Sequence, residues 1–457
     1  RGMQFCPLTD IPMCSGYTDT MRRQSVGWIV GLTLLGSSLS AIGETPTLWG
    51  IPVSEYAQRR ERISQMLQSD QIAILASESS PPTRMRFRQE SNFMYLTGLE
   101  AMNGVLVILP EDSPAGERVV LFLPRQSLVS RLFEGPLPEP NDETRRATGI
   151  EAIRERGELA EFLAEALQHH PRVLANRPAR TLLADTLREA NPEAQLSSID
   201  RLMASLRVVK SPAEIAVMRK AIAASIAGHR ALAQRLAPRV YEYELEGVAQ
   251  EAFRRHGSER EGYPMIIGSG PNACILHYNA NKRQVRANEL VLVDIGAEYS
   301  YYTADLTRTY PASGKFTPRQ RELYIAVLDA MKHAEQEAKP GITLRQLHQK
   351  VVEFFRNHPL RAKDENGNEQ TLDRFFVHGL SHMLGMDVHD LDPNQPLRPG
   401  MVFTIEPGLY IPAEGIGIRI EDNYLVTENG VENLSRALPR EPDAVERMVR
   451  GGRPSRR

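Results

Sequence analysis

Four carboxylates and one imidazole in the C-terminal half are the residues best suited to chemistry. They lie in apolar, strand-like segments where ionised groups are unusual: Asp294, Asp305, His382, Glu406 and Glu421. If these side chains converge, two like charges about 4 Å apart repel by about 4 kcal/mol at an effective dielectric constant near 20. Two divalent cations would balance four carboxylates and leave the imidazole as a neutral ligand. The pattern therefore predicts the ligand set of a two-metal hydrolase.

Strand periodicity favours convergence of these side chains. Residues i and i+2 of a strand share one face. In the segment 415–421, three isoleucines occupy one face, and Arg419 and Glu421 occupy the other. Arg419 is therefore predicted to hold Glu421 by a charge-assisted hydrogen bond. Asp294 ends the apolar run 290–293, which is typical of a buried strand.

Taken singly, each of these residues has an ordinary explanation. An aspartate after an apolar run is often a turn residue or a helix cap, and a single buried histidine usually packs in a core. All five occur together, with further histidines nearby. This combination favours a metal site over five unrelated explanations.

The elements that must position these residues are predicted from hydrophobic periodicity. Helices are expected at 53–67, 243–256, 318–337 and 344–357, and strands at 72–75, 105–109 and 119–123. The segment 141–166 is expected to be helical in part, and 184–190 ends another helix. A capping box at Ser211 and Glu214, with proline between them, predicts a long helix that ends near Leu236.

The order Asp, Asp, His, Glu, Glu resembles the pita-bread metallopeptidases, which include methionine aminopeptidase, prolidase and aminopeptidase P. Most similar to the bacterial aminopeptidase P family are the segments GSGPNACILHY, VDIGAEYSYYTADLTRTYP, HGLSHMLGMDVHD, TIEPGLY and GIGIRIED, with RFRQESNFMYLTG nearer the N-terminus. This family removes the N-terminal residue from peptides with proline second. The resemblance spans about Tyr56 to Leu434. It implies an α/β (α+β) chain with an N-terminal creatinase-like α/β domain and a C-terminal pita-bread catalytic domain.

The resemblance implies a role for each metal ligand. Asp305 and Glu421 would bridge two metal ions. Asp294 would complete the coordination of one ion, and His382 and Glu406 that of the other. A metal-bridging hydroxide would attack the scissile carbonyl, and Glu406 would pass its proton towards the departing proline nitrogen.

Three histidines and one arginine would complete the catalytic set that the resemblance implies. His378 and His389 would bind the peptide carbonyl and stabilise the charge that develops on it. His277 would line the entrance to the same pocket, and Arg419 would orient a ligand. Oxygen ligands with one imidazole suit two divalent ions, with Mn(II) expected and Fe(II), Co(II) or Zn(II) as alternatives.

The same sequence is also compared with other possible functions: a prolidase, a binding protein and an enzyme with a nucleophilic cysteine or serine. A prolidase, which cuts only Xaa-Pro dipeptides, shares the metal set and stays open as an alternative. A non-catalytic binding protein on the same scaffold is less favoured, because all five ligand positions are occupied. Cys274 lies three residues before His277, but no oxyanion motif accompanies this pair. Ser381 lacks the G-x-S-x-G elbow of a nucleophilic serine.

Length and charge are consistent with a two-domain enzyme. The 457 residues exceed one ordinary core. The net charge of −2, with mixed signs, gives no electrostatic case for nucleic acid. The resemblance suggests homodimers or homotetramers that act on Xaa-Pro peptides. The expected segments are a leader with upstream extension (1–43), an N-terminal domain (44–207), a catalytic domain (208–435) and an Arg-rich, flexible tail (436–457).

The first segment has the pattern of a secretory signal. Arg22 and Arg23 precede a short apolar stretch at 26–35 and a small-residue site that ends at Gly43. A leader from about Met21 to Gly43 predicts a periplasmic or secreted protein, with a membrane-anchored or cytoplasmic one as the alternative. The apolar stretch is too short to predict a stable membrane span. Cys6 and Cys14 would leave with this leader, so the single remaining cysteine, Cys274, would have no intramolecular partner.

Overall fold

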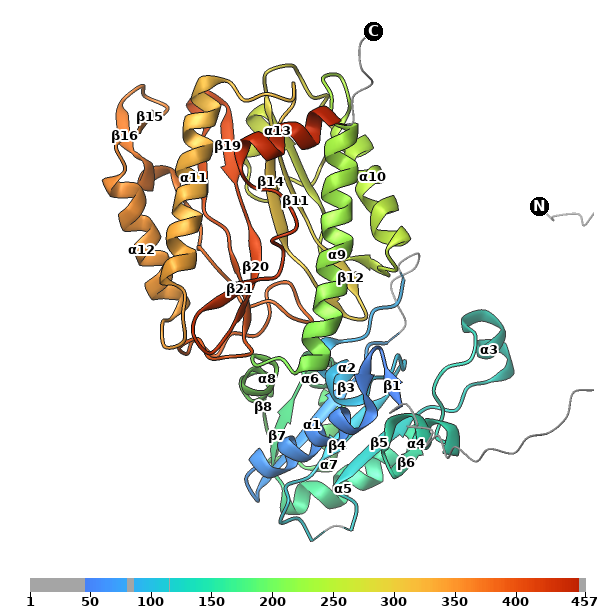
Figure 1. Cartoon of the computed structure of the whole chain (residues 1–457). Helices are drawn as coiled ribbons and strands as arrows, with labels where there is room; N and C mark the ends of the chain where they lie inside the picture. The colour runs from blue at the N-terminus through green and yellow to red at the C-terminus, as the bar shows by residue number, and fades with distance from the viewer. Residues whose placement is uncertain (1–45, 80–85, 115, 452–457) are drawn as a thin grey trace, which may run out of the picture. The chain divides into compact units, whose positions relative to one another are not determined.

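The computed structural model describes residues 46–79, 86–114 and 116–451 (Figure 1). The predicted leader, Met21 to Gly43, lies outside the described residues, as do residues 452–457 of the predicted tail. A short hairpin of β1 (Thr47–Leu48) and β2 (Ile51–Pro52) opens the described chain.

The N-terminal half contains a six-stranded mixed sheet in the order β6-β5-β4-β3-β7-β8. β4 pairs antiparallel with both β3 and β5, and the outer pairs are parallel. The strand predictions at 72–75, 105–109 and 119–123 are confirmed. The strands are β3 (Gln71–Ala76), β4 (Val105–Ile108), β5 (Val119–Leu123), β6 (Ala152–Glu155), β7 (Arg172–Ala175) and β8 (Gln195–Ser198).

Alternation along these strands gives the sheet two apolar faces. In β3, Ala73 and Leu75 join one core cluster, while Ile72 and Ile74 join another on the opposite face. Helices cover both faces, as Figure 1 shows for α1 and α5. The helices are α1 (Val53–Met66), α2 (Ser91–Thr97), α3 (Leu128–Glu134), α4 (Asp142–Thr148), α5 (Leu159–His169), α6 (Arg177–Leu182), α7 (Ala184–Ala190) and α8 (Asp200–Arg207).

The partly helical segment 141–166 contains a strand as well. β6 separates α4 from α5, because the edge of the sheet offers pairing to residues 152–155. In contrast, α7 ends at Ala190 as predicted.

The C-terminal half begins with the long helix α9 (Pro212–Arg235), and its predicted capping box is confirmed. Ser211 Oγ accepts a hydrogen bond from the Glu214 amide at 3.2 Å, and the Glu214 carboxylate accepts one from the Ser211 amide at 2.8 Å. Figure 1 shows α9 beside α10, and α11 beside α12. The other helices are α10 (Glu242–Arg255), α11 (Pro318–Glu337), α12 (Leu344–Asn357) and α13 (Pro442–Gly451). α11 and α12 have the predicted bounds.

Short antiparallel sheets fill the space between these helices. Three of them carry the predicted site residues, in the orders β10-β11-β14, β17-β20-β21 and β18-β19. Their strands are β10 (Ile266–Ser269), β11 (Leu290–Ile295), β14 (Leu306–Pro311), β17 (Val402–Ile405), β18 (Gly408–Ile411), β19 (Ile416–Arg419), β20 (Asp422–Val426) and β21 (Val431–Asn433). The smaller sheets hold β9 (Arg260–Glu261), β12 (Ala297–Tyr299), β13 (Tyr302–Thr303), β15 (Arg361–Lys363) and β16 (Glu369–Thr371).

The prediction of a solvated tail at 436–457 is wrong for its described residues, 436–451. Val445 and Val449 of α13 are fully buried. The Arg440 guanidinium binds both carboxylate oxygens of Glu335 at 2.8 Å. The high arginine content suggested a solvated segment, but Val445 and Val449 form an i, i+4 apolar pair that packs against the core. The predicted domain boundaries stay predictions.

Across the described residues, no helix combines the length and apolarity needed to cross a membrane.

Candidate active site

The two predicted aspartates are placed by a pair of antiparallel strands. Asp294 lies in β11 opposite Thr307 of β14, and Asp305 directly precedes β14. The chain turns sharply between them. At Gly296, a Cβ atom would collide with the Ala304 carbonyl oxygen. A residue without a side chain is therefore needed where the segment after Asp294 passes close to the segment before Asp305.

The other three ligands arrive on neighbouring segments. Glu406 follows β17, and its amide donates to the Leu380 carbonyl at 2.9 Å. The Thr404 amide donates to the His382 carbonyl at 3.0 Å, so the histidine segment runs along β17. Glu421 lies between β19 and β20 and forms an isolated bridge with Thr307. Backbone pairing thus fixes all five side chains.

All nine predicted site residues line one cavity of about 300 Å³. Leu276, Gly379 and Ser381 contribute to its wall as well. The site residues are Asp294, Asp305, His382, Glu406, Glu421, His277, His378, His389 and Arg419. The sequence therefore identified a set of residues that converge in space.

His382 points its Nε2 atom into the carboxylates. This atom lies 3.4 Å from Asp305 Oδ2, 3.6 Å from Glu406 Oε1 and 4.0 Å from Glu421 Oε1. The other ring nitrogen, Nδ1, lies 3.1 Å from the Met383 carbonyl oxygen. A carbonyl oxygen can only accept a hydrogen bond, so this contact assigns the hydrogen to Nδ1 and leaves Nε2 free to bind a metal ion.

The carboxylates are difficult to ionise together. Burial, reinforced by the neighbouring carboxylates, raises the pKa of Glu421 well above its usual range. Burial raises the pKa of Glu406 to about 8 and that of Asp294 to about 6. The pKa of Asp305 is lowered instead, because the hydrogen bond and charge of His382 outweigh burial. The same interaction raises the pKa of His382 to about 9 against the effect of burial. Without cations, protons must hold this cluster together.

Glu421 supplies a direct test of whether the site fits a metal ion. Its Oε2 atom accepts a hydrogen bond from Thr307 Oγ1 at 2.8 Å. Its Oε1 atom is buried and has no hydrogen-bond donor among the described residues. Ligand atoms of Asp305, His382 and Glu421 lie within 4.8 Å of one another. An unpaired carboxylate oxygen beside further oxygen and imidazole ligands fits a divalent ion.

The predicted bond from Arg419 to Glu421 is wrong. Arg419 Nη2 donates to Asp294 Oδ2 at 2.5 Å, and Nη1 donates to Tyr410 Oη at 2.7 Å. The two side chains do share a face, since both line the cavity, but they do not bond to each other directly. Thr307 lies between the two side chains, since its hydroxyl accepts from Arg419 Nε at 3.1 Å and donates to Glu421.

Two tyrosines at the site were not predicted. Tyr263 Oη lies 2.5 Å from Asp294 Oδ1 and 2.6 Å from Asp305 Oδ1. Tyr410 Oη lies 2.9 Å from His378 Nε2. Tyr410 stands inside the segment TIEPGLY, so the motif itself offered a signal. Tyr263 lies between the charged residues 259–261 and β10, where nothing in the sequence marks it as a site residue, and its role follows only from the fold.

The three further histidines differ in exposure. His378 is partly buried; its Nδ1 lies 2.7 Å from the Gly379 carbonyl oxygen and 3.7 Å from Glu406 Oε2. Burial lowers the pKa of His378 to about 4, so this ring is neutral at physiological pH. His277 and His389 are exposed at the cavity, and the His389 ring packs against His382 with centroids 4.3 Å apart.

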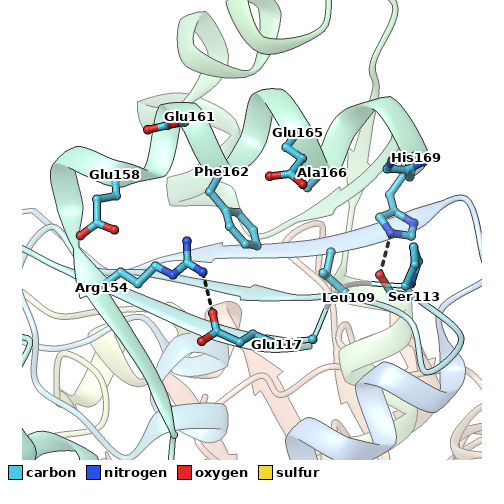
Figure 2. A pocket seen from close by; sticks show the side chains of 13 residues that line it. Leu109, Ser113, Glu117, Arg154, Glu158, Glu161, Phe162, Glu165, Ala166 and His169 are labelled. Carbon is cyan, nitrogen blue, oxygen red and sulfur yellow. Dashed lines mark hydrogen bonds and ion pairs between the residues drawn. The ribbon is translucent and has the colours of Figure 1, made fainter.

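Two other features carry no predicted chemistry. Burial raises the pKa of the Cys274 thiol to about 11, which disfavours the reactive thiolate. A larger cavity of about 620 Å³ lies in the N-terminal half beside α5 (Figure 2). Two pairs of its polar groups bond to each other, Arg154 with Glu117 at 2.6 Å and Ser113 with His170 at 3.1 Å. None of the predicted site residues lines it.

Two family models match the chain. The model described as metallopeptidase family M24 matches residues 216–428, and the aminopeptidase P N-terminal domain matches residues 56–174. The site and both matches define a metallopeptidase of the M24 class. Divalent metal ions are therefore part of its active form, and the predicted combination of an N-terminal α/β domain with a pita-bread domain is confirmed.

Comparison with individual proteins narrows this class. The Xaa-Pro aminopeptidase of Escherichia coli (strain K12) is 32% identical over 428 residues, which are 86% of this chain and 97% of that protein. Xaa-Pro aminopeptidase 3 of Homo sapiens is 30% identical over 443 residues, 87% of this chain and 86% of that protein. Zinc-substituted E. coli aminopeptidase P in complex with product has a TM-score of 0.81 at 31% identity, covering 89% of this chain and 100% of that chain. This chain belongs to the aminopeptidase P family.

Proposed function

We propose that this protein hydrolyses the bond between an N-terminal residue and a proline at the second position of a peptide. The observation that carries this proposal is the convergence of all nine predicted residues on one cavity. Membership of the aminopeptidase P family supports the same substrate class. The chain is thus an Xaa-Pro aminopeptidase in activity.

The metal ligands in this proposal are Asp294, Asp305, His382, Glu406 and Glu421. When bound, two divalent ions would supply Lewis acidity that polarises the scissile carbonyl and activates water. We propose Mn(II) as the natural ion, with Fe(II), Co(II) and Zn(II) as alternatives, because oxygen ligands dominate the set. Tyr263 and Arg419 would hold the orientation of Asp294 through their bonds to its two carboxylate oxygens.

Glu406 is the proposed proton carrier. In the absence of metal, burial raises its pKa to about 8, which shows how strongly this position disfavours an uncompensated charge. It would take a proton from the attacking water and deliver it to the proline nitrogen as the peptide bond breaks. His382 Nε2 lies 3.6 Å from its Oε1 atom, and His378 Nδ1 lies 3.7 Å from Oε2.

His378 and His389 are the proposed substrate-binding groups. Tyr410 Oη contacts His378 Nε2 and itself receives a hydrogen bond from Arg419, so this ring has a fixed orientation. His389 projects into the same cavity from an irregular loop. His389 would donate to the substrate carbonyl as negative charge develops on it. His378 would donate there only by exchanging its Nδ1 hydrogen bond to the Gly379 carbonyl for one to the substrate. His277 would line the entrance.

A peptide series tests the function. Proline lacks an amide hydrogen and has a fixed φ angle, so an enzyme adapted to it should discriminate strongly against other second residues. We expect release of the N-terminal residue from Xaa-Pro-Xaa and little release from Xaa-Ala-Xaa. An acetylated N-terminus is the matched control and should abolish cleavage. Efficient hydrolysis of Xaa-Pro dipeptides with inert tripeptides would show a prolidase.

Two finer proposals rest mainly on sequence. The leader from about Met21 to Gly43 would direct the protein to the periplasm or to secretion, and N-terminal sequencing of native protein should begin near Glu44. A homodimer or homotetramer is the proposed assembly. Its support, besides the family resemblance, is helix α3, where Leu128 and Phe133 are 74% and 82% exposed. A monomer by light scattering would contradict it.

A further inference from the structure

The loop that carries His389 has no regular secondary structure between Leu384 and Asp390. Among the described residues, nothing hydrogen-bonds the His389 imidazole, whose only ring contact is with His382. The position of His389 in the cavity therefore depends on the backbone on either side of it. What fixes that backbone also fixes a proposed substrate-binding group.

Arg207 binds one side chain on each side of His389. Its Nη2 atom donates to Asp387 Oδ2 at 2.7 Å and to Asp390 Oδ1 at 2.5 Å. Its Nη1 atom donates to Asn92 Oδ1 at 2.7 Å. Arg207 is 2% exposed and is the last residue of α8. One planar guanidinium thus connects the N-terminal half of the chain to the residues two before and one after His389.

Three further side chains hold the same loop. Lys210 Nζ donates to Asp390 Oδ2 at 3.2 Å. Ser91 Oγ donates to Asp387 Oδ1 at 2.7 Å, and Arg88 Nη2 donates to the Met386 carbonyl at 2.7 Å. We call Arg88, Ser91, Arg207 and Lys210 the loop clamp. The whole clamp comes from outside the segment that it holds.

The fit between clamp and loop leaves little room for adjustment. A methyl group at Gly385 would overlap the Asp390 carboxylate and lie 3.1 Å from Lys210 Cε. Two cations face two anions: Arg207 and Lys210 are buried with Asp390, and Arg207 also binds Asp387, whose side chain is 41% exposed. Such a network specifies one geometry at a desolvation cost that apolar packing would avoid. A fixed geometry favours catalysis, because a displacement of a substrate-binding group by about 1 Å lowers the rate about 100-fold.

We propose that Arg207 is a positioning residue that acts on catalysis through His389, so that the N-terminal half helps to build the substrate-binding site. This inference rests on the proposed function, because it takes His389 as a group that binds substrate. It assigns a task to the loop clamp that metal binding does not require. None of the four clamp residues lines the cavity.

A double-mutant cycle with His389 tests the proposal. With saturating metal and an Xaa-Pro-Xaa substrate, Arg207→Gln should lower kcat/KM about 10- to 100-fold. Bound metal should stay at the wild-type level, and Arg207→Lys should recover part of the loss. In the His389→Ala background, Arg207→Gln should lower kcat/KM by less than about twofold. An equal loss in both backgrounds, or a loss that follows metal content, would overturn the proposal.

A milder variant covers the case in which Arg207→Gln does not fold. Ser91→Ala removes one hydrogen bond to Asp387 and should lower kcat/KM about fivefold, again only while His389 is present. The control is Arg219→Gln at an exposed ion pair, where Arg219 contacts Glu432 at 2.8 Å; it should change nothing. Full activity of Ser91→Ala, or the same loss without His389, contradicts the proposal. A wild type inactive on all Xaa-Pro peptides would instead refute the proposed function, and this inference with it.

Discussion

Buried acidic residues of the C-terminal half occur in two settings that differ in how their charge is neutralised. Asp422 and Arg308 form an ion pair at 2.7 Å, and neither side chain is exposed. Arg440 adds a second cation at 3.3 Å from Asp422. Arg308 also donates to the backbone carbonyls of Glu421, Leu438 and Pro439. The chain itself supplies every partner that this carboxylate needs.

The metal-ligand cluster lies directly beside that pair, since Glu421 precedes Asp422. Its four carboxylates have two cationic partners from the chain, Arg419 and His382. Glu421 Oε1 lacks a donor among the described residues, and burial raises the pKa of Glu406 to about 8. The contrast indicates that protein cations neutralise Asp422, whereas the charge of the four-carboxylate cluster requires bound metal ions.

The largest expected effect is on activity at the cluster. Asp305→Asn and Glu406→Gln should each lower kcat by at least about 1000-fold, because one removes a proposed bridging ligand and the other the proposed proton carrier. Both should fold, since neutral amides relieve the repulsion. The matched variant is His389→Ala, which should bind wild-type amounts of metal and lose about 100-fold in kcat. Fewer bound ions in His389→Ala, with normal turnover per ion, would contradict these roles.

The second effect concerns stability at the balanced pair. Arg308→Met should lower the free energy of unfolding of the metal-loaded protein by about 3–5 kcal/mol, because it leaves Asp422 buried without its principal partner. Urea unfolding would measure this loss. The same change at the exposed Arg219 should cost less than about 1 kcal/mol. Equal effects at both positions would show that burial does not distinguish them.

The third and smallest effect is the pH dependence of metal-free protein. Burial raises the pKa of Glu406 to about 8, and the partnership with Asp305 raises that of His382 to about 9. A raised folded-state pKa gives stability that is complete below the ordinary pKa and is lost as pH rises through the folded value. As the pH rises from about 5 to 9 in the presence of chelator, the protein should therefore lose roughly 2 kcal/mol of stability. Its thermal unfolding should shift to lower temperature over this range. Metal-loaded protein should lack this pH dependence of stability. A metal-free protein whose stability did not fall with rising pH would contradict the difference between the two settings.

The sequence predicted which residues converge, because carboxylates and an imidazole in apolar strands are unusual unless they meet at a site; their metal binding stays a prediction. Helix bounds such as Pro318–Glu337 followed from caps and periodicity, which are local properties. The partner of Arg419 was missed, since Asp294 and Thr307 reach it from other strands. Tyr263 and α13 were missed for a similar reason, because their contacts join residues far apart in the sequence.

The most direct test of the central claim is metal analysis paired with activity. Purified protein should contain about two divalent ions per chain and cleave Xaa-Pro-Xaa. Removal of the ions with a chelator should abolish this activity, and Mn(II) or another divalent ion should restore it. Full activity in a sample shown to be free of metal would contradict the account.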